Sequence, residues 1–270
     1  MKVQIFLPVV LLFTAVLFHG CSVQGGQGLN FFSIDDDIAM GKEFSNQIES
    51  DPAHYPLLKE KGNEEVYRYI RGLTQELLNT GKVAYSDKFE WKVKIIEDDT
   101  TLNAFAVPGG YLYVYTGLIK YLDSEDQLQG VMGHEIAHAA LRHSTKQMSK
   151  IYGLDAIRQM ATGNAQAGVL GQYALGLVSL KFSRKHEAQA DEYSVIYLCE
   201  TGKYAAGAAG FFRKIKAASS GSGQSQPQFL STHPDPGNRI EAIEKKAKEL
   251  GCQGQEHNKA KYERIKKLLK

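Results

Sequence analysis

The hydrophobic residues of this chain follow two different periods. Within residues 66–77 they recur every three or four positions, which predicts an amphipathic helix. Within residues 89–95 they alternate with charged residues, which predicts a half-buried strand. Residues 103–107 and 111–115 predict two further strand segments, joined by a Pro-Gly-Gly turn.

The rest of the chain is predominantly helical in its pattern. Ser124 followed by Gln127 predicts a capped helix start, and Asp35 to Asp37 favour the positive end of a helix dipole. The predicted helices are residues 34–49, 124–143, 182–200, the segment between Pro236 and Gly251, and residues 257–270. The Gly- and Ala-rich residues 163–180 predict a packed helix or an active-site cover, and 219–228 predict a flexible loop. We therefore predict an α+β fold, mostly α with a small sheet, in one domain over residues 34–270.

The N-terminus predicts export. Ile5 to Phe18 is uncharged but short for a bilayer-spanning helix, so residues 1–20 are interpreted as a signal peptide. The sequence before Cys21 resembles a bacterial lipobox, which predicts a lipidated Cys21 and a tether over residues 21–33. The alternative is an ordinary signal cut near Gly20, with Cys21 left as a thiol. By the habit of bacterial lipoproteins, Ser rather than Asp at position 22 favours a location at the inner face of the outer membrane.

The three cysteines and the charge balance bear on the compartment and on the kind of protein. If Cys21 carries lipid, Cys199 and Cys252 remain to form a disulfide in an oxidising compartment; the alternative is two buried thiols. The chain has 32 Lys plus Arg and 30 Asp plus Glu, a net charge of +2. This balance argues against a nucleic-acid binder. Removal of residues 1–20 takes away only one charged residue, Lys2.

The candidate chemistry lies in the His-Glu-x-x-His pattern of residues 134–138. His134 and His138 are one helical turn apart, so both imidazoles can bind one Zn²⁺. Glu135 lies about 100° around the helix and is predicted to act as general base toward a water that the metal polarises. The alternative is a pair of structural histidines, but the neighbouring residues are small and apolar, and buried polar groups need partners.

A catalytic zinc site usually has a third protein ligand. Leu141 and Ser144 stand where a metzincin would have Gly and His, which excludes that class. Glu187 and Asp191 share a face of a predicted helix; Glu187 is the predicted third ligand, and Asp191 is predicted to accept the outer N–H of a ligand histidine. The alternative is that both are solvated charges.

These motifs together resemble the HtpX/CAAX-prenyl-protease family of zinc metallopeptidases. The resemblance rests on residues 103–110, 134–138, 183–191, 231–234 and on Arg239. It implies a zincin-type domain whose edge strand lies over the zinc-binding helix. The chain is more similar to the soluble periplasmic lipoprotein branch, because transmembrane helices are not predicted after the signal.

The resemblance also implies roles for further residues. Asn103, Ala104, Phe105 and Ala106 are expected to pair with an extended substrate backbone; the alternative is a plain strand. His233 is expected either to stabilise the oxyanion or to reach the metal in a resting state. Arg239 is expected to assist the oxyanion or to anchor its loop.

The sequence thus predicts a zinc endopeptidase with one Zn²⁺ per chain, lipid-anchored in the periplasm and acting on unfolded or misassembled envelope proteins. The alternative function is a chaperone-like assembly factor for outer-membrane proteins with secondary or autoinhibited proteolysis. Oligomeric state is not predicted.

Overall fold

The computed structural model of the chain describes residues 29–151, 181–219, 227–234, 237–252, 254 and 258–269. The predicted signal peptide, Cys21, the Gly- and Ala-rich residues 163–180 and most of the predicted loop at 219–228 lie outside the described residues. Within the described part, none of the helices is both long and apolar enough to cross a membrane.

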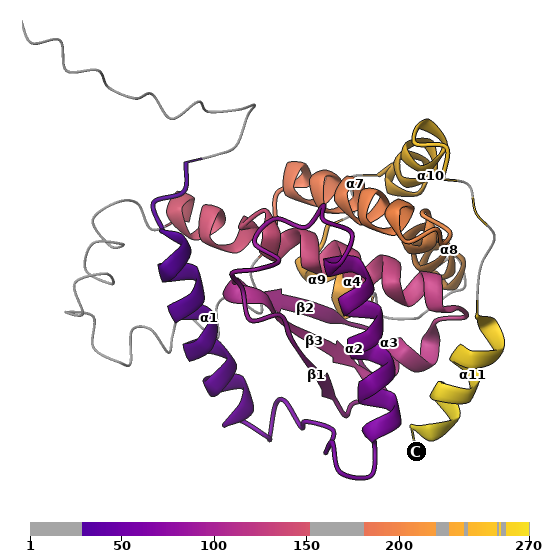
Figure 1. Cartoon of the computed structure of the whole chain (residues 1–270), viewed down its shortest axis with the longest axis horizontal. Helices are drawn as coiled ribbons and strands as arrows, with labels where there is room; N and C mark the ends of the chain where they lie inside the picture. Colours follow the sequence, from indigo (N-terminus) through magenta and orange to yellow (C-terminus); the bar gives the residue numbers. More distant parts are fainter. Residues whose placement is uncertain are drawn as a thin grey trace, which may run out of the picture.

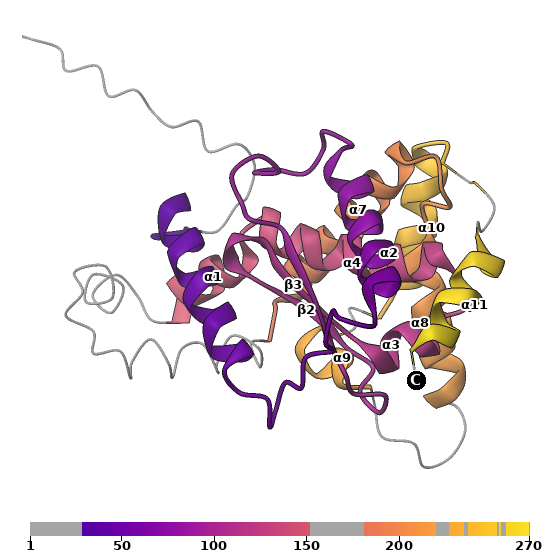
Figure 2. The same cartoon turned by 60° about the horizontal axis from the view of Figure 1, so that its bottom comes forward.

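Helices cover both faces of a small sheet (Figures 1 and 2). In the described residues the sheet has three strands in the order β1-β3-β2, with β1 parallel and β2 antiparallel to the central β3. The strands are β1 (Lys92–Ile96), β2 (Ala104–Val107) and β3 (Tyr111–Tyr115). Gly109 and Gly110 have φ angles of 74° and 89°, so the turn between β2 and β3 uses backbone conformations that glycine readily adopts.

The alternation along β3 divides the core into two parts. Tyr111, Tyr113 and Tyr115 face the first helix, α1 (Ile34–Glu49), and form a cluster with its Met40, Phe44 and Ile48. Leu112 and Val114 point to the opposite face and belong to the larger core. That core also contains α2 (Glu64–Leu78) and the central helix α4 (Glu125–Ala140).

The helices that follow pack around α4, which is buried along its whole length. They are α3 (Thr116–Tyr121), α7 (Arg184–Glu200), α8 (Gly207–Ser219), α9 (Gln228–Thr232), α10 (Arg239–Glu249) and α11 (Lys259–Leu268). A Cβ on Gly130 of α4 would lie 2.3 Å from the backbone N of Ala208, so glycine is required where α8 approaches. On another face of α4, Ser194 of α7 donates a 2.6 Å hydrogen bond to the Gly130 carbonyl.

Most of the predicted elements are present, with three differences. The predicted strand begins at Lys92 rather than Phe89, because Trp91 has a φ of 43° that is incompatible with a strand. The predicted helix 124–143 ends at Ala140; Arg142 has a φ of 60°, and a new helical segment begins at His143. Helices α3, α8 and α9 were missed by the sequence patterns.

Candidate active site

Three helices bring the predicted site residues together. His134, Glu135 and His138 lie on α4, Glu187 and Asp191 on α7, and His233 directly follows α9. Their side chains are almost completely buried. Ser124 caps α4 and Ser183 caps α7, each accepting a hydrogen bond from a backbone N–H three residues later, which fixes where both helices begin.

Four of these side chains converge on one point. One ligand atom from each of His134, His138, Glu187 and His233 lies within 4.8 Å of the other three. The Nε2 atoms of the two α4 histidines are 3.0 Å apart, and the Glu187 carboxylate lies 3.4 Å from Nε2 of His134 and 3.5 Å from Nε2 of His138. A group of buried nitrogen and carboxylate donors that face one another fits a metal cation, because each offers a lone pair to the same position.

Asp191 and Arg239 support this cluster from behind. Oδ1 of Asp191 lies 2.8 Å from Nδ1 of His134, on the side of the ring away from the cluster. Arg239, the first residue of α10, donates from Nε and Nη2 to the two oxygens of Asp191, at 2.9 and 2.7 Å. Its Nη2 also lies 3.3 Å from Glu187, and Nη1 donates weakly to the His233 carbonyl at 3.5 Å. This geometry favours the predicted loop-anchoring position of Arg239.

Two opposing effects set the pKa values in the cluster: burial disfavours the charged form of each side chain, and neighbouring groups of opposite charge favour it. Burial disfavours the charged form of His134, but Asp191 and Glu187 outweigh it and raise its pKa to about 9. Burial lowers the pKa of His138 to about 3. Burial acts to raise the pKa of Glu187, but hydrogen bonds from the three histidines hold it well below its usual range. The cluster therefore presents an ionised carboxylate at neutral pH.

Glu135 lies next to this cluster, on the side that faces the sheet. Burial raises the pKa of its carboxyl, while His233 and His134 partly oppose the shift, and the backbone N–H of Ala106 donates to it. Its Oε1 has no hydrogen-bond partner among the described residues and lies 3.5 Å from Nε2 of His233. Glu135 thus lies between the cluster and β2.

The edge strand β2 lies beside α4, as predicted (Figure 1). Tyr115 donates to the carbonyl of Asn103, so in the antiparallel register Asn103, Phe105 and Val107 bond to β3. The backbone groups of Ala104 and Ala106 point to the outer side. Of the four predicted substrate-pairing residues, only Ala104 and Ala106 therefore have outward backbone groups. Phe105 packs its ring on Tyr113, and the Oδ1 of Asn103 is buried without a partner in the described part of the chain.

Sequence reasoning missed one polar neighbour of the site. His143 was interpreted as a cation at a helix C-terminus, but it is completely buried and its pKa is lowered by that burial. Its Nδ1 lies 3.0 Å from Nδ1 of His138, and its ring stacks on His186 with centroids 4.4 Å apart. The only sequence signal was its position five residues after His138.

The structure also places the two remaining cysteines together. Cys199, near the end of α7, and Cys252, after α10, are joined as a disulfide with Cα atoms 5.3 Å apart. Such a separation is typical of disulfides.

Comparison with known proteins assigns the family. Residues 64–247 match the model of peptidase family M48, which is more than half of the chain. The chain belongs to this family. Together with the buried donors of His134, His138, Glu187 and His233, this membership identifies the chain as a metalloendopeptidase of the zincin type. This confirms the predicted family, enzyme class and fold class.

Individual relatives agree with this assignment. Metalloprotease LoiP of Escherichia coli K12 is 29% identical over 231 residues, which are 83% of this chain and 86% of LoiP. Metalloprotease YcaL of the same bacterium is 34% identical over 161 residues, 57% of this chain and 60% of YcaL. A putative beta-barrel assembly-enhancing protease of Vibrio cholerae is 30% identical over 163 residues, 56% of this chain and 34% of that protein. The chain thus spans most of LoiP but less than two thirds of the other two.

Proposed function

We propose that the chain is a zinc-dependent endopeptidase of the bacterial cell envelope that cleaves unfolded or misassembled envelope proteins. The observation that carries this proposal is the convergence of His134, His138 and Glu187 beside Glu135 and the outer edge of β2. A metal site, a buried base and an edge strand are three parts with which a metallopeptidase can bind and hydrolyse a peptide.

His134, His138 and Glu187 would hold one Zn²⁺ per chain. Two imidazole nitrogens and a carboxylate oxygen are a usual ligand set for catalytic zinc. Asp191 fixes the ring of His134 by accepting from its Nδ1, and Arg239 fixes Asp191 in turn. When bound, zinc would supply Lewis-acid polarisation of the scissile carbonyl.

Glu135 would act as the general base. Its raised pKa makes the carboxylate a stronger base than an exposed glutamate, so it can take a proton from the attacking water and later deliver it to the leaving amine. His233, with Nε2 3.5 Å from Glu135, is placed on the same side and would donate a hydrogen bond to the oxyanion.

The outer edge of β2 would bind the substrate as an added strand. The outward N–H and carbonyl of Ala104 and the outward carbonyl of Ala106 offer main-chain hydrogen bonds, which select for an extended backbone rather than for particular side chains. The N–H of Ala106 donates to Glu135 instead. Unfolded chains expose such backbone, whereas folded proteins bond it internally. This supports unfolded envelope proteins as the substrate class.

The envelope location rests on the N-terminal sequence. A signal over residues 1–20 and lipidation of Cys21 would anchor the domain to a membrane through the tether 21–33. The relative named as a beta-barrel assembly-enhancing protease supports placing the chain at the periplasmic face of the outer membrane.

Glu135→Gln tests the proposal. The substitution removes the base but leaves the metal ligands, so we expect retained zinc and casein cleavage lowered by at least about 100-fold. Zinc content and casein cleavage are measured for the wild type, for Glu135→Gln and for Glu241→Gln, an exposed glutamate on α10 that serves as the control. A wild type that neither binds zinc nor cleaves casein would contradict the proposal.

The second candidate function is an assembly factor whose protease is held shut. The position of His233 favours it, because Nδ1 of that residue lies 3.2 Å from Glu187 and 3.3 Å from Nε2 of His134, inside the ligand cluster. Complete rescue of a gene deletion by Glu135→Gln would assign the main function to assembly, and failure to rescue would assign it to proteolysis. A rise in casein cleavage for His233→Ala would indicate that His233 restrains the enzyme.

A further inference from the structure

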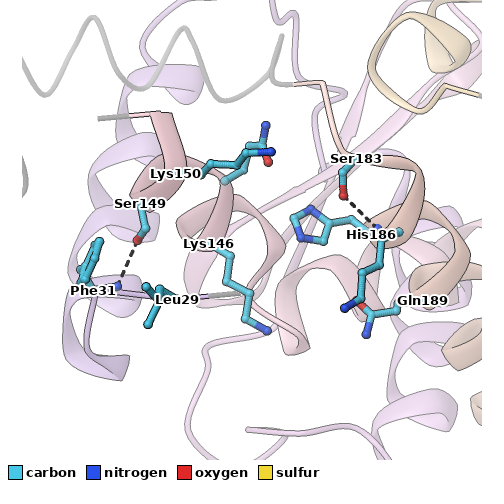
Figure 3. Close-up of a pocket in the computed structure, with 10 residues that line it drawn as sticks. Leu29, Phe31, Lys146, Ser149, Lys150, Ser183, His186 and Gln189 are labelled. Atoms are coloured by element: carbon cyan, nitrogen blue, oxygen red, sulfur yellow. Dashed lines mark hydrogen bonds between the residues drawn. The ribbon is translucent and has the colours of Figure 1, made fainter. Parts of the chain in front are cut away.

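A pocket outside the active site opens between the N-terminal segment, the helical residues 143–151 and the start of α7 (Figure 3). Its volume is about 390 Å³. Leu29 and Phe31 line it from the N-terminal segment, and Phe31 is fixed by a 3.0 Å hydrogen bond from its backbone N–H to Ser149. The first described residues and the helical segment that follows α4 thus form two walls of the pocket.

The charge of this pocket is positive. Lys146, Lys150 and Lys185 line it together with His186, and among the residues that the structure describes none of the ten that line it is acidic. Burial lowers the pKa of Lys146, and the positive charges of Arg142 and Lys185 lower it further. An anion in the pocket would relieve this repulsion.

Exposed apolar side chains lie in and next to this pocket: Leu29 and Phe31 line it, and Ile151 directly follows Lys150, which also lines it. Leu29, Phe31 and Ile151 are 78%, 40% and 52% exposed, and they are three of the five large exposed hydrophobic residues in the described part of the chain. The other two, Leu250 and Leu268, belong to the α10 and α11 end, which lies on the opposite side of the molecule from α1 in both overall views (Figures 1 and 2). Single exposed apolar residues are ordinary, but a group of them beside lysines is typical of a membrane-contacting surface.

The chain connects this face to the proposed lipid anchor over a short distance. Leu29 follows Cys21 by eight residues. Eight fully extended residues span at most about 28 Å, so an acylated Cys21 keeps Leu29 within that distance of the bilayer. The tether therefore joins the described structure at the face with the lysines and the exposed apolar residues.

We propose that this face, formed by Leu29, Phe31, Lys146, Lys150, Ile151 and Lys185, docks on a bilayer surface that carries anionic phospholipids. The headgroup phosphates contact the lysines in the pocket, and the three apolar side chains enter the interfacial region. The inference rests on the proposed envelope location, but the contact itself does not require the acyl chains. Docking orients the enzyme on the membrane and provides a second attachment besides the anchor.

Vesicle binding of an unacylated chain tests the docking separately from lipidation. Residues 21–270 with Cys21→Ser are sedimented with vesicles of phosphatidylcholine alone or mixed with phosphatidylglycerol. The test variant carries Lys146→Gln, Lys150→Gln and Lys185→Gln. The control variant carries Lys245→Gln, Lys248→Gln and Lys267→Gln, which remove the same charge from the α10 and α11 end. Casein cleavage, which none of these lysines serves, reports that each variant is folded.

We expect the starting protein and the control to bind the anionic vesicles and to bind neutral vesicles much more weakly. Each lysine near an anionic surface contributes about fivefold, so the test variant should bind about 100-fold more weakly, and high salt should abolish the difference. Phe31→Ser should weaken binding at either salt concentration.

Three results would overturn the docking proposal: equal weakening by both triple variants, equal binding to neutral vesicles, or binding of soluble glycerol phosphate without binding to vesicles. The last would make the pocket a site for a small anion. Mass spectrometry of Cys21 in the membrane fraction decides independently whether this residue is lipidated. If the unmutated protein does not cleave casein, that result counts against the proposed function and not against docking.

Discussion

At the scale of single residues, His143 completes the surroundings of the metal-binding cluster. His134 has Asp191 as the acceptor for its outer ring nitrogen, and His138 has His143 in the corresponding place, with the two Nδ1 atoms 3.0 Å apart. Burial keeps His143 neutral, and a neutral imidazole has one acceptor nitrogen that can take the N–H of His138. We therefore propose His143 as a positioning residue that would act on a bound metal through His138.

His143→Phe keeps the ring but removes the acceptor. We expect zinc affinity to fall by about 10- to 100-fold, as when other outer partners of ligand histidines are removed. Competition with a coloured chelator measures this affinity. His186→Phe, which retains an aromatic ring against residue 143, is the matched control and should bind zinc as the wild type does. Equal affinities for both variants and the wild type would show that His143 only fills space.

At the scale of elements, the sequence predicted those whose periodicity is regular and whose ends have recognisable caps. The helix at 34–49 has the predicted bounds, and His134, Glu135 and His138 lie on the predicted capped helix. Helix α8 was missed because its first turn contains Gly207 and Gly210, which are poor helix formers but allow the close approach to Asp126 and Gln127 of α4. The break after Ala140 was missed because it depends on a long-range contact, the pairing of Arg142 with Asp37. The closeness of His143 to His138 follows from that break.

The N-terminus of α4 depends on a buried charge network. Glu125 is 1% exposed and accepts from Tyr69, Asn258 and Lys203 at 2.6, 2.8 and 2.6 Å. Burial alone would raise its pKa, but Lys203, Tyr69 and Asn258 hold it below the ordinary value of 4.5. A group with a lowered folded-state pKa stabilises the fold above its unfolded pKa, and this contribution is lost as the pH falls through the folded pKa.

Glu125→Gln should therefore destabilise the protein at neutral pH by about 2 kcal/mol. This is less than for a fully broken buried pair, because Lys203 keeps its contact with Glu76. The difference from the wild type should shrink as the pH falls below 4.5. Urea unfolding across this pH range measures it, with Glu241→Gln as the exposed control. A difference that does not change with pH would indicate lost packing rather than lost charge.

At the scale of the whole molecule, α7 and α10 form a pair that holds the site together. Arg239 contacts Asp191, Lys246 contacts Glu192 at 2.6 Å, and Cys252 joins Cys199, so the two helices run side by side in the same direction. The contact of Arg239 with Asp191 lies at the cluster, whereas the disulfide lies at the other end of the pair. The disulfide should therefore act on the stability of the domain and only weakly on the metal.

Removal of the disulfide by Cys199→Ser and Cys252→Ser tests this division. The bond closes a loop with a sequence separation of 53 residues. On the chain-entropy model, its loss lowers the free energy of unfolding by about 4 kcal/mol, because the unfolded chain regains that freedom. Denaturant unfolding of the double variant should match that of the wild type in reductant, while zinc affinity stays within about threefold because Arg239 still holds Asp191. Two titratable thiols in the unreduced wild type would show that the cysteines are not bonded, and a large loss of zinc affinity in a folded double variant would show that the disulfide also fixes the ligands.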